Sequence, residues 1–124
     1  DGGKDFRNEI KGTTAGVVIG DRALEQLKIS TFVYDLAQNW IDFTGLPFVF
    51  AAWVANKQLP EDFLDGFNMA NGDGLKHIDE VVAENPYDVY DLKKYYTKNI
   101  SYMLNDEKRK GLELFLKYLE ELNG

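Results

Sequence analysis

Hydrophobic residues gather in short continuous runs in the first half of the chain and recur at helical spacing in the second half. The runs at 15–20, 31–34 and 46–54 are rich in β-branched or aromatic residues and are bounded by glycine, aspartate or proline. Continuous apolar runs of this length are typical of strands buried on both faces, as in parallel sheets. We therefore expect three strands, with the longest, 46–54, at or near the centre of a sheet.

Short helices are expected between these strands. Asp21 is the predicted N-cap of a helix over 22–28, and Asp35 is the predicted N-cap of a helix that runs to about residue 43. Thr44 and Gly45 are expected to end the second helix, because glycine readily adopts the left-handed conformation of a C-cap. The local order is therefore strand, helix, strand, helix, strand.

After residue 57 the hydrophobic period changes from two residues to about 3.6, which predicts helices as far as the end of the sequence. A helical segment is expected over 60–85, as one helix or as two with a break near Asn71, because its three glycines weaken it. A further helix is expected over 88–103, and Asn105 is the predicted N-cap of the last one. Strands followed by amphipathic helices indicate an α/β fold in which helices cover a mostly parallel sheet.

Composition and charge exclude several classes of partner. The chain has 124 residues, which suits one domain, and it has no cysteine for disulfides or thiolate chemistry. Fourteen basic and 21 acidic residues give a net charge of −7, so the average field repels nucleic acid and anionic lipid. No apolar run approaches the roughly 18 residues that a membrane span needs. We therefore expect neither a nucleic-acid nor a membrane partner.

Metal binding is disfavoured at both places where suitable ligand types occur. Asn71, Asp73 and Glu80 have the spacing of ligands in an EF-hand loop, but Met69 occupies the first ligand position and offers calcium no oxygen. His77 is the only histidine, and a zinc site would need further converging ligands. We therefore expect no metal site, and interpret both features as parts of helices.

Two turns are candidate ligand sites. Gly20 and Asp21 follow the run at 15–20, and open α/β sheets bind ligands beyond the carboxyl ends of their strands. Asp21 is equally suited to cap the next helix, so both interpretations stay open. The second turn, Gly45 to Phe48, joins the end of a helix to the longest predicted strand. Taken alone, it is more typical of a simple turn.

Three sequence blocks carry a family resemblance. They are Val17-Val18-Ile19-Gly20-Asp21-Arg22-Ala23-Leu24, then Tyr34-Asp35-Leu36-Ala37-Gln38-Asn39-Trp40, then Thr44-Gly45-Leu46-Pro47-Phe48-Val49-Phe50-Ala51-Ala52-Trp53. In wording, order and spacing they resemble the chorismate dehydratases of the futalosine route to menaquinone. The resemblance covers nearly the whole chain but only about half of the family, its carboxyl-terminal half. Because the chain also begins with Asp1 rather than methionine, we expect a piece of a longer polypeptide.

The resemblance implies a fold and a site. The family has the two-lobed architecture of periplasmic solute-binding proteins (type II), an α/β fold that holds chorismate in the cleft between its lobes. Residues 1–34 would form the end of the second lobe and residues 35–124 the returning segment of the first. The resemblance implies a catalytic role for Asp21. It also implies that the substrate contacts Gly20, Asp21, Gly45, Leu46, Pro47 and Phe48.

The activity that the resemblance implies is loss of water from chorismate to give 3-[(1-carboxyvinyl)oxy]benzoate. Formation of an aromatic ring drives this elimination, which needs orientation and proton transfer but neither a metal nor an organic cofactor. We expect a cytoplasmic lyase whose small-molecule partner is its substrate, chorismate. Two alternatives stay open: a non-catalytic solute-binding or sensor protein of the same fold, and an inactive fragment that dimerises or swaps through an exposed apolar sheet edge.

Overall fold

A computed structural model describes residues 5–124, so Asp1, named above, lies outside the described residues. The chain divides into two units. Unit 1 consists of Asp1–Val33 with Tyr87–Tyr90, and unit 2 consists of Tyr34–Pro86 with Asp91–Gly124. The predicted division into parts of two lobes, 1–34 and 35–124, stays a prediction.

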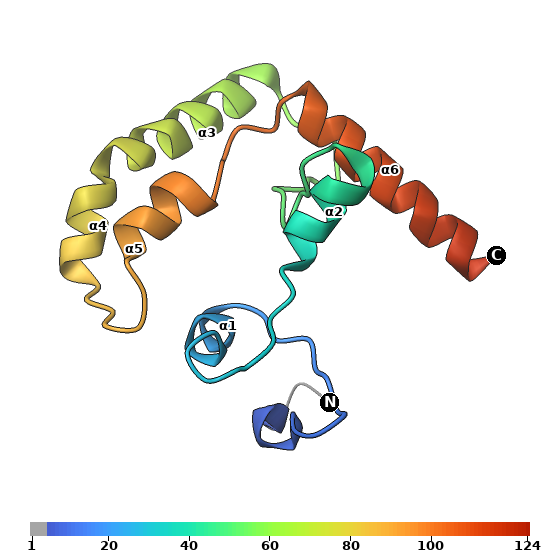
Figure 1. Ribbon diagram of the computed structural model, residues 1–124. Helices are drawn as coiled ribbons and strands as arrows, with labels where there is room; N and C mark the ends of the chain where they lie inside the picture. Colours follow the sequence, from blue (N-terminus) through green and yellow to red (C-terminus); the bar gives the residue numbers. More distant parts are fainter. Residues whose placement is uncertain (1–4) are drawn as a thin grey trace. The chain divides into compact units, whose positions relative to one another are not determined.

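Unit 1 contains the 3-10 helix η1 (Phe6–Glu9) and the short helix α1 (Asp21–Gln26), seen in blue in Figure 1. The Asp5 side chain caps η1 by accepting a hydrogen bond from the Arg7 amide at 3.2 Å. The Arg7 guanidinium binds Asp5 Oδ2 at 2.6 Å and Glu25 Oε2 at 2.5 Å. Because Glu25 lies in α1, this pair of contacts connects the two helices of the unit.

Unit 2 is built from helices of very different lengths. They are α2 (Leu36–Thr44), α3 (Glu61–Gly74), the 3-10 helix η2 (Leu75–His77), α4 (Ile78–Glu84), α5 (Leu92–Lys94), the π-helical turn η3 (Tyr95–Asn99) and α6 (Asp106–Asn123). Helix α3 continues through η2 into α4, and α5 lies beside α4 (Figure 1).

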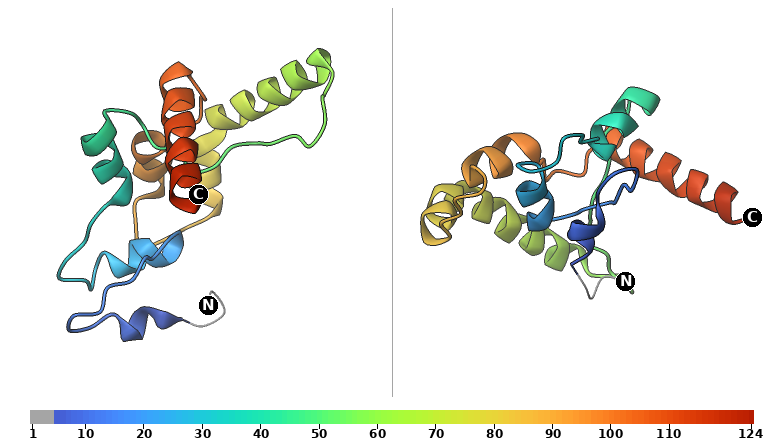
Figure 2. Two further views of the ribbon diagram at one scale, coloured as in Figure 1. Left: turned by 90° about the vertical axis from the view of Figure 1, so that its right-hand side faces the viewer. Right: turned by 60° about the horizontal axis from the view of Figure 1, so that its bottom comes forward.

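Aromatic side chains hold α2, α6 and the segment between α2 and α3 together, and Figure 2 shows α2 beside α6. The Trp40 ring of α2 lies edge-on to Phe48, with centroids 5.9 Å apart, and to Phe115 of α6, at 5.6 Å. Phe48 and Phe115 also meet edge-on at 5.0 Å, a favourable geometry for aromatic pairs. Gly111 is buried at this contact, where the α6 backbone passes the Pro47 carbonyl.

The predicted α/β fold class is wrong for the described residues, because none of residues 5–124 forms a strand. The runs at 15–20, 31–34 and 46–54 are non-helical segments without partner strands, drawn as loops in Figures 1 and 2. Several of their large side chains are exposed where burial was predicted: Phe32 by 80%, Phe50 by 74% and Trp53 by 83%. A strand exists only through hydrogen bonds to another strand, and no such partner occurs in residues 5–124. The dimer expected from an apolar sheet edge stays an untested prediction, although that edge is not formed here.

Several predicted helix ends are confirmed. Asp35 Oδ1 accepts hydrogen bonds from the amides of Ala37 and Gln38 at 2.9 and 3.2 Å, as an N-cap should. Gly45 ends α2 with φ 73° and ψ 5°, in the left-handed region. Asn105 caps α6 by accepting from the Lys108 amide at 3.0 Å.

Other helix boundaries differ from the predictions. The segment over 60–85 is interrupted at Leu75–His77 rather than near Asn71. The helix expected over 88–103 is confined to residues 92–99, since Asp91 caps α5 and the π-helical turn ends at Asn99. The predicted N-cap Asp21 is instead the first residue of α1, and Gly20 is the N-cap.

Candidate functional site

Of the first predicted site, Asp21 lines a hollow of about 600 Å³ in unit 1, and Gly20 immediately precedes it as the N-cap of α1. Apolar and charged side chains both line it: Phe6, Arg7, Val17, Val18, Ile19, Asp21 and Arg22. Val17 is 67% exposed and Ile19 is 80% exposed, so apolar groups of the hollow are open to solvent. A hollow lined by both apolar and charged side chains is suited to a small amphiphilic molecule.

The backbone before α1 leaves the Asp21 carboxylate free. Gly20 adopts φ 67° and ψ −150°, a conformation that side-chain-bearing residues rarely take, and it supplies no side chain to cap the helix. The Asp21 carboxylate accepts no hydrogen bond and forms no ion pair within residues 5–124. The capping role considered from the sequence is therefore not the one that this side chain has. Contact with a substrate stays a prediction.

Arg7 and Arg22, both at this hollow, have different surroundings. Arg7 donates to both carboxylate oxygens of Asp5, through Nε at 2.8 and 3.1 Å, and also binds Glu25. These hydrogen bonds lower the pKa of Asp5 to about 2 and raise the pKa of Arg7 above its usual value. The Arg22 guanidinium has no ion pair or hydrogen bond within the described part of the chain.

Tyr87 reaches this region from far along the chain. Its hydroxyl donates a long hydrogen bond of 3.5 Å to the Asp21 carbonyl oxygen. Burial raises the pKa of Tyr87, and the negative charges of Asp21 and Glu25 raise it further. Sequence reasoning did not identify Arg7, Arg22 or Tyr87 as site residues. Arg22 lies inside the first family block and was identifiable there, whereas no local signal connects Tyr87 to a residue 66 positions earlier.

The second predicted site, Gly45 to Phe48, belongs to unit 2 and is engaged in packing. The Gly45 amide donates to the Ile41 carbonyl at 2.7 Å, and the Leu46 amide donates to Thr44 Oγ1 at 3.1 Å. Pro47 packs against Gly111 and Phe48 joins the aromatic cluster. The predicted substrate contacts thus fall in two units, and this turn has a clear structural role of its own.

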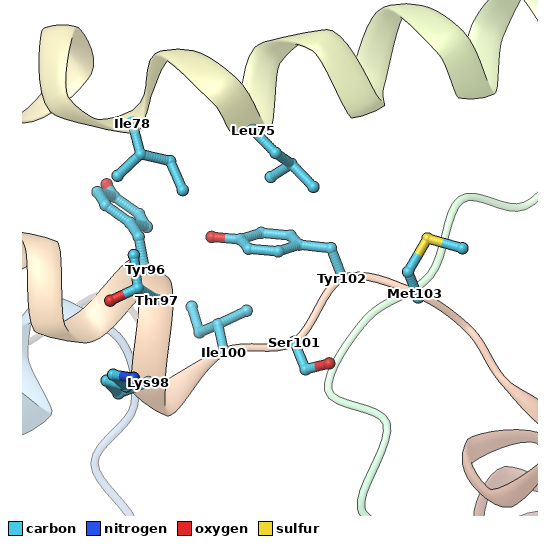
Figure 3. A pocket seen from close by; sticks show the side chains of 9 residues that line it. All are labelled: Leu75, Ile78, Tyr96, Thr97, Lys98, Ile100, Ser101, Tyr102 and Met103. Carbon is cyan, nitrogen blue, oxygen red and sulfur yellow. The ribbon is translucent and has the colours of Figure 1, made fainter.

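A second hollow, of about 400 Å³, lies in unit 2 between η2, the start of α4 and the segment after α5 (Figure 3). The Tyr102 ring lies beneath Leu75, and the Tyr96 ring lies beneath Ile78. Partial burial raises the pKa of Tyr102, with Tyr96 and Tyr95 adding to the shift. The Lys108 ammonium fixes the segment at the rim by binding the Ser101 and Met103 carbonyls, both at 2.7 Å.

The Met69–Glu80 segment, with its EF-hand-like spacing, forms the end of α3, then η2 and the start of α4 rather than a loop. No group of three or more histidine, aspartate or glutamate side chains in the described residues is arranged to hold a metal ion. None of the helices described is both long and apolar enough to cross a membrane.

Comparison with known proteins assigns the chain to a family. Residues 4–121 match the profile of a family described as menaquinone biosynthesis. The chain belongs to the menaquinone biosynthesis family. This confirms the family resemblance found in the three sequence blocks, and the match extends over nearly all of the residues.

The menaquinone biosynthesis assignment is accompanied by a curated relative. The chain is similar to the chorismate dehydratase of Campylobacter jejuni subsp. jejuni serotype O:23/36 (strain 81-176), with 32% identity over 111 residues. The aligned region covers 86% of this chain and 50% of that protein, so the chain spans about half the length of this relative. No solved structure matches the chain.

Proposed function

We propose that this chain is the carboxyl-terminal portion of a chorismate dehydratase that acts in the cytoplasm, on the futalosine route to menaquinone. The observation that carries the proposal is the similarity to the Campylobacter jejuni chorismate dehydratase, which includes 86% of the chain. The free Asp21 carboxylate beside the apolar hollow of unit 1 supports it. Because the chain spans half of its relative, we propose activity for the longer polypeptide and none for the isolated chain.

The proposed reaction removes one molecule of water from chorismate. A ring hydrogen beside the enolpyruvyl ether leaves as a proton, its electron pair enters the ring, and the neighbouring hydroxyl leaves with a second proton as water. The product is 3-[(1-carboxyvinyl)oxy]benzoate, and the new aromatic ring supplies the driving force. The protein must hold the hydroxyl and move a proton, which are tasks for positioned acid and base groups.

We assign to Asp21 the binding of the hydroxyl that leaves chorismate. Its carboxylate is not engaged by the helix that it begins, so it is available to orient the leaving hydroxyl or to assist its protonation. Because Gly20 has no side chain, a substrate can approach the backbone before α1 closely. Unit 1 therefore contributes one polar contact to a site that other parts of the polypeptide complete.

The first test is mass-spectrometric detection of water loss from chorismate, with the 124-residue chain and its parent polypeptide compared side by side. We expect turnover by the parent and none by the chain. Asp21→Asn in the parent should lower kcat by about a hundredfold, within the usual contribution of a general acid or base. Asp65→Asn is the matched control, because Asp65 is exposed on α3 and has no hydrogen bond or ion pair in the described residues.

Three results would contradict parts of this proposal. Turnover by neither polypeptide would remove the dehydratase function, and binding of chorismate without water loss would favour a non-catalytic solute-binding role. Unchanged kcat in Asp21→Asn would remove Asp21 from the reaction and leave the rest of the proposal standing.

A further inference from the structure

Two neighbouring side chains of opposite charge lie at the unit 1 hollow, and neither forms a hydrogen bond or an ion pair among residues 5–124. Asp21 and Arg22 are the first two residues of α1, and both line the hollow. They form no ion pair with one another, and neither side chain is hydrogen-bonded to any other residue in 5–124. The Asp21 carboxylate can therefore accept a hydrogen bond from a bound molecule, and the Arg22 guanidinium can bind an anionic group of the same molecule.

The charge of Arg22 helps to lower the pKa of Asp5, but the Arg22 guanidinium forms no hydrogen bond or ion pair among residues 5–124. Asp5 is held by Arg7 through several hydrogen bonds, the shortest 2.6 Å, and Glu25 binds the same guanidinium at 2.5 Å. Both carboxylates are thus already hydrogen-bonded to Arg7. Arg22 is the guanidinium of this hollow that remains for an external anion.

We propose that Arg22 binds a carboxylate of the molecule held in this hollow, and that this molecule is a hydroxylated cyclic carboxylic acid. The planar guanidinium matches a carboxylate with two parallel hydrogen bonds. The ring of the acid packs on the exposed apolar groups of Val17 and Ile19 and on Phe6. Its hydroxyl donates to Asp21. This inference deepens the proposed dehydratase function, since chorismate is an acid of this class, and it rests on that function for the identity of the natural ligand.

Binding to the 124-residue chain provides a test that needs no turnover. The probe is 3-hydroxybenzoate, followed by the NMR shifts of the backbone amides of Gly20, Asp21 and Arg22, with 3-hydroxybenzamide as its uncharged counterpart. We expect 3-hydroxybenzoate to bind at least about tenfold more tightly than the amide, as is usual for a charge-assisted hydrogen bond. Arg22→Gln should abolish this preference, and Arg22→Lys should restore part of it, because lysine keeps the charge but loses the two-pronged geometry.

Arg109→Gln is the matched control, because Arg109 lies on α6 in unit 2 and its guanidinium has no partner among the described residues. It should leave the preference for 3-hydroxybenzoate unchanged. The circular dichroism spectra of all three variants should match that of the unsubstituted chain, so that loss of folding is recognised.

The outcomes separate this inference from the proposed function. No binding of 3-hydroxybenzoate, or equal binding of acid and amide, overturns the inference. The same holds if Arg22→Gln retains the preference.

In the parent polypeptide, Arg22→Gln should raise KM for chorismate by about tenfold or more. If the parent dehydrates chorismate and this variant does not change KM, the inference fails and the function stands. If Arg22 binds the probe but the parent does not dehydrate chorismate, the inference stands and the function fails.

Discussion

Replacing Gly111 by alanine tests the packing of α6 against the segment after α2. A methyl group at Gly111 would meet the Pro47 carbonyl oxygen at a distance no real Cβ contact shows, and it would lie 3.4 Å from the Pro47 carbonyl carbon and 3.6 Å from Leu46 Cβ. The obstructing atom belongs to the backbone, so it cannot turn aside as the end of a side chain can. The substitution therefore forces α6 and the Gly45–Phe48 turn apart.

The expected magnitude is a difference between two opposing effects. Overpacking of a tight contact costs about 2 kcal/mol, within the usual range of 1 to 3 kcal/mol. Alanine in place of glycine inside a helix returns about 1 kcal/mol. We expect the free energy of unfolding of Gly111→Ala to be lower than that of the unsubstituted chain by about 1 kcal/mol.

Gly66→Ala is the control, because Gly66 is inside α3 and a methyl group there has no atom within 4 Å. Only the helix-propensity effect applies, so this variant should be more stable by about 1 kcal/mol. Urea unfolding followed by far-UV circular dichroism measures both variants. With a typical urea dependence, each change moves the midpoint by about 0.5 M, in opposite directions.

A midpoint for Gly111→Ala equal to or above that of the unsubstituted chain would refute the close approach of α6 to Pro47. A lowered midpoint for Gly66→Ala would instead indicate that α3 is not the helix described. A fall in both variants would mean that the two glycines share a requirement unrelated to the Pro47 contact.

Two further predictions concern titration, and NMR measures both. Asp5 should titrate with a pKa of about 2, and in Arg7→Gln this pKa should return toward 3.8. Because the pKa is lower in the folded than in the unfolded chain, the contribution of Asp5 to stability is present above about pH 4 and is lost as the pH falls toward 2. A titration of Asp5 that Arg7→Gln leaves unchanged would contradict the ion pair. His77 Nδ1 lies 2.9 Å from Glu80 Oε1, which raises the pKa of His77, so Glu80→Gln should lower it, and an unaltered imidazole titration would exclude that contact.

The predictions from local patterns succeeded where the interaction spans a few residues. Asp35 and Asn105 cap helices by binding amides two or three positions ahead, and Gly45 ends α2 through its own backbone conformation. Helix length was less predictable: of the two alternatives, one helix or a break near Asn71, neither is found, because the interruption at Leu75–His77 follows Gly74. Propensity identifies weak positions within a helix but does not select among them.

The strand predictions failed because a strand is not a local structure. The 46–54 segment has the composition of a buried strand, yet Phe50 and Trp53 are exposed and no partner strand is present in residues 5–124. Apolar β-branched and aromatic residues show that a segment fits a pleated, buried surface, but neighbouring strands must provide that surface. The candidate site was partly predictable: Asp21 lines a hollow, but the sequence did not indicate that its side chain forms no hydrogen bond or ion pair among residues 5–124.

By itself, the sequence determined the family, through the three blocks around Asp21, Trp40 and Pro47, and the positions of the helix caps. Both depend on residues close together in the chain. Only the tertiary structure decided which charges are paired. Arg7 binds a glutamate 18 positions away, whereas the Arg22 guanidinium forms no ion pair among residues 5–124. It also brought Gly111 against Pro47. These contacts join residues that are far apart in the sequence. Which contacts form depends on the path of the whole backbone and not on a local pattern of residues.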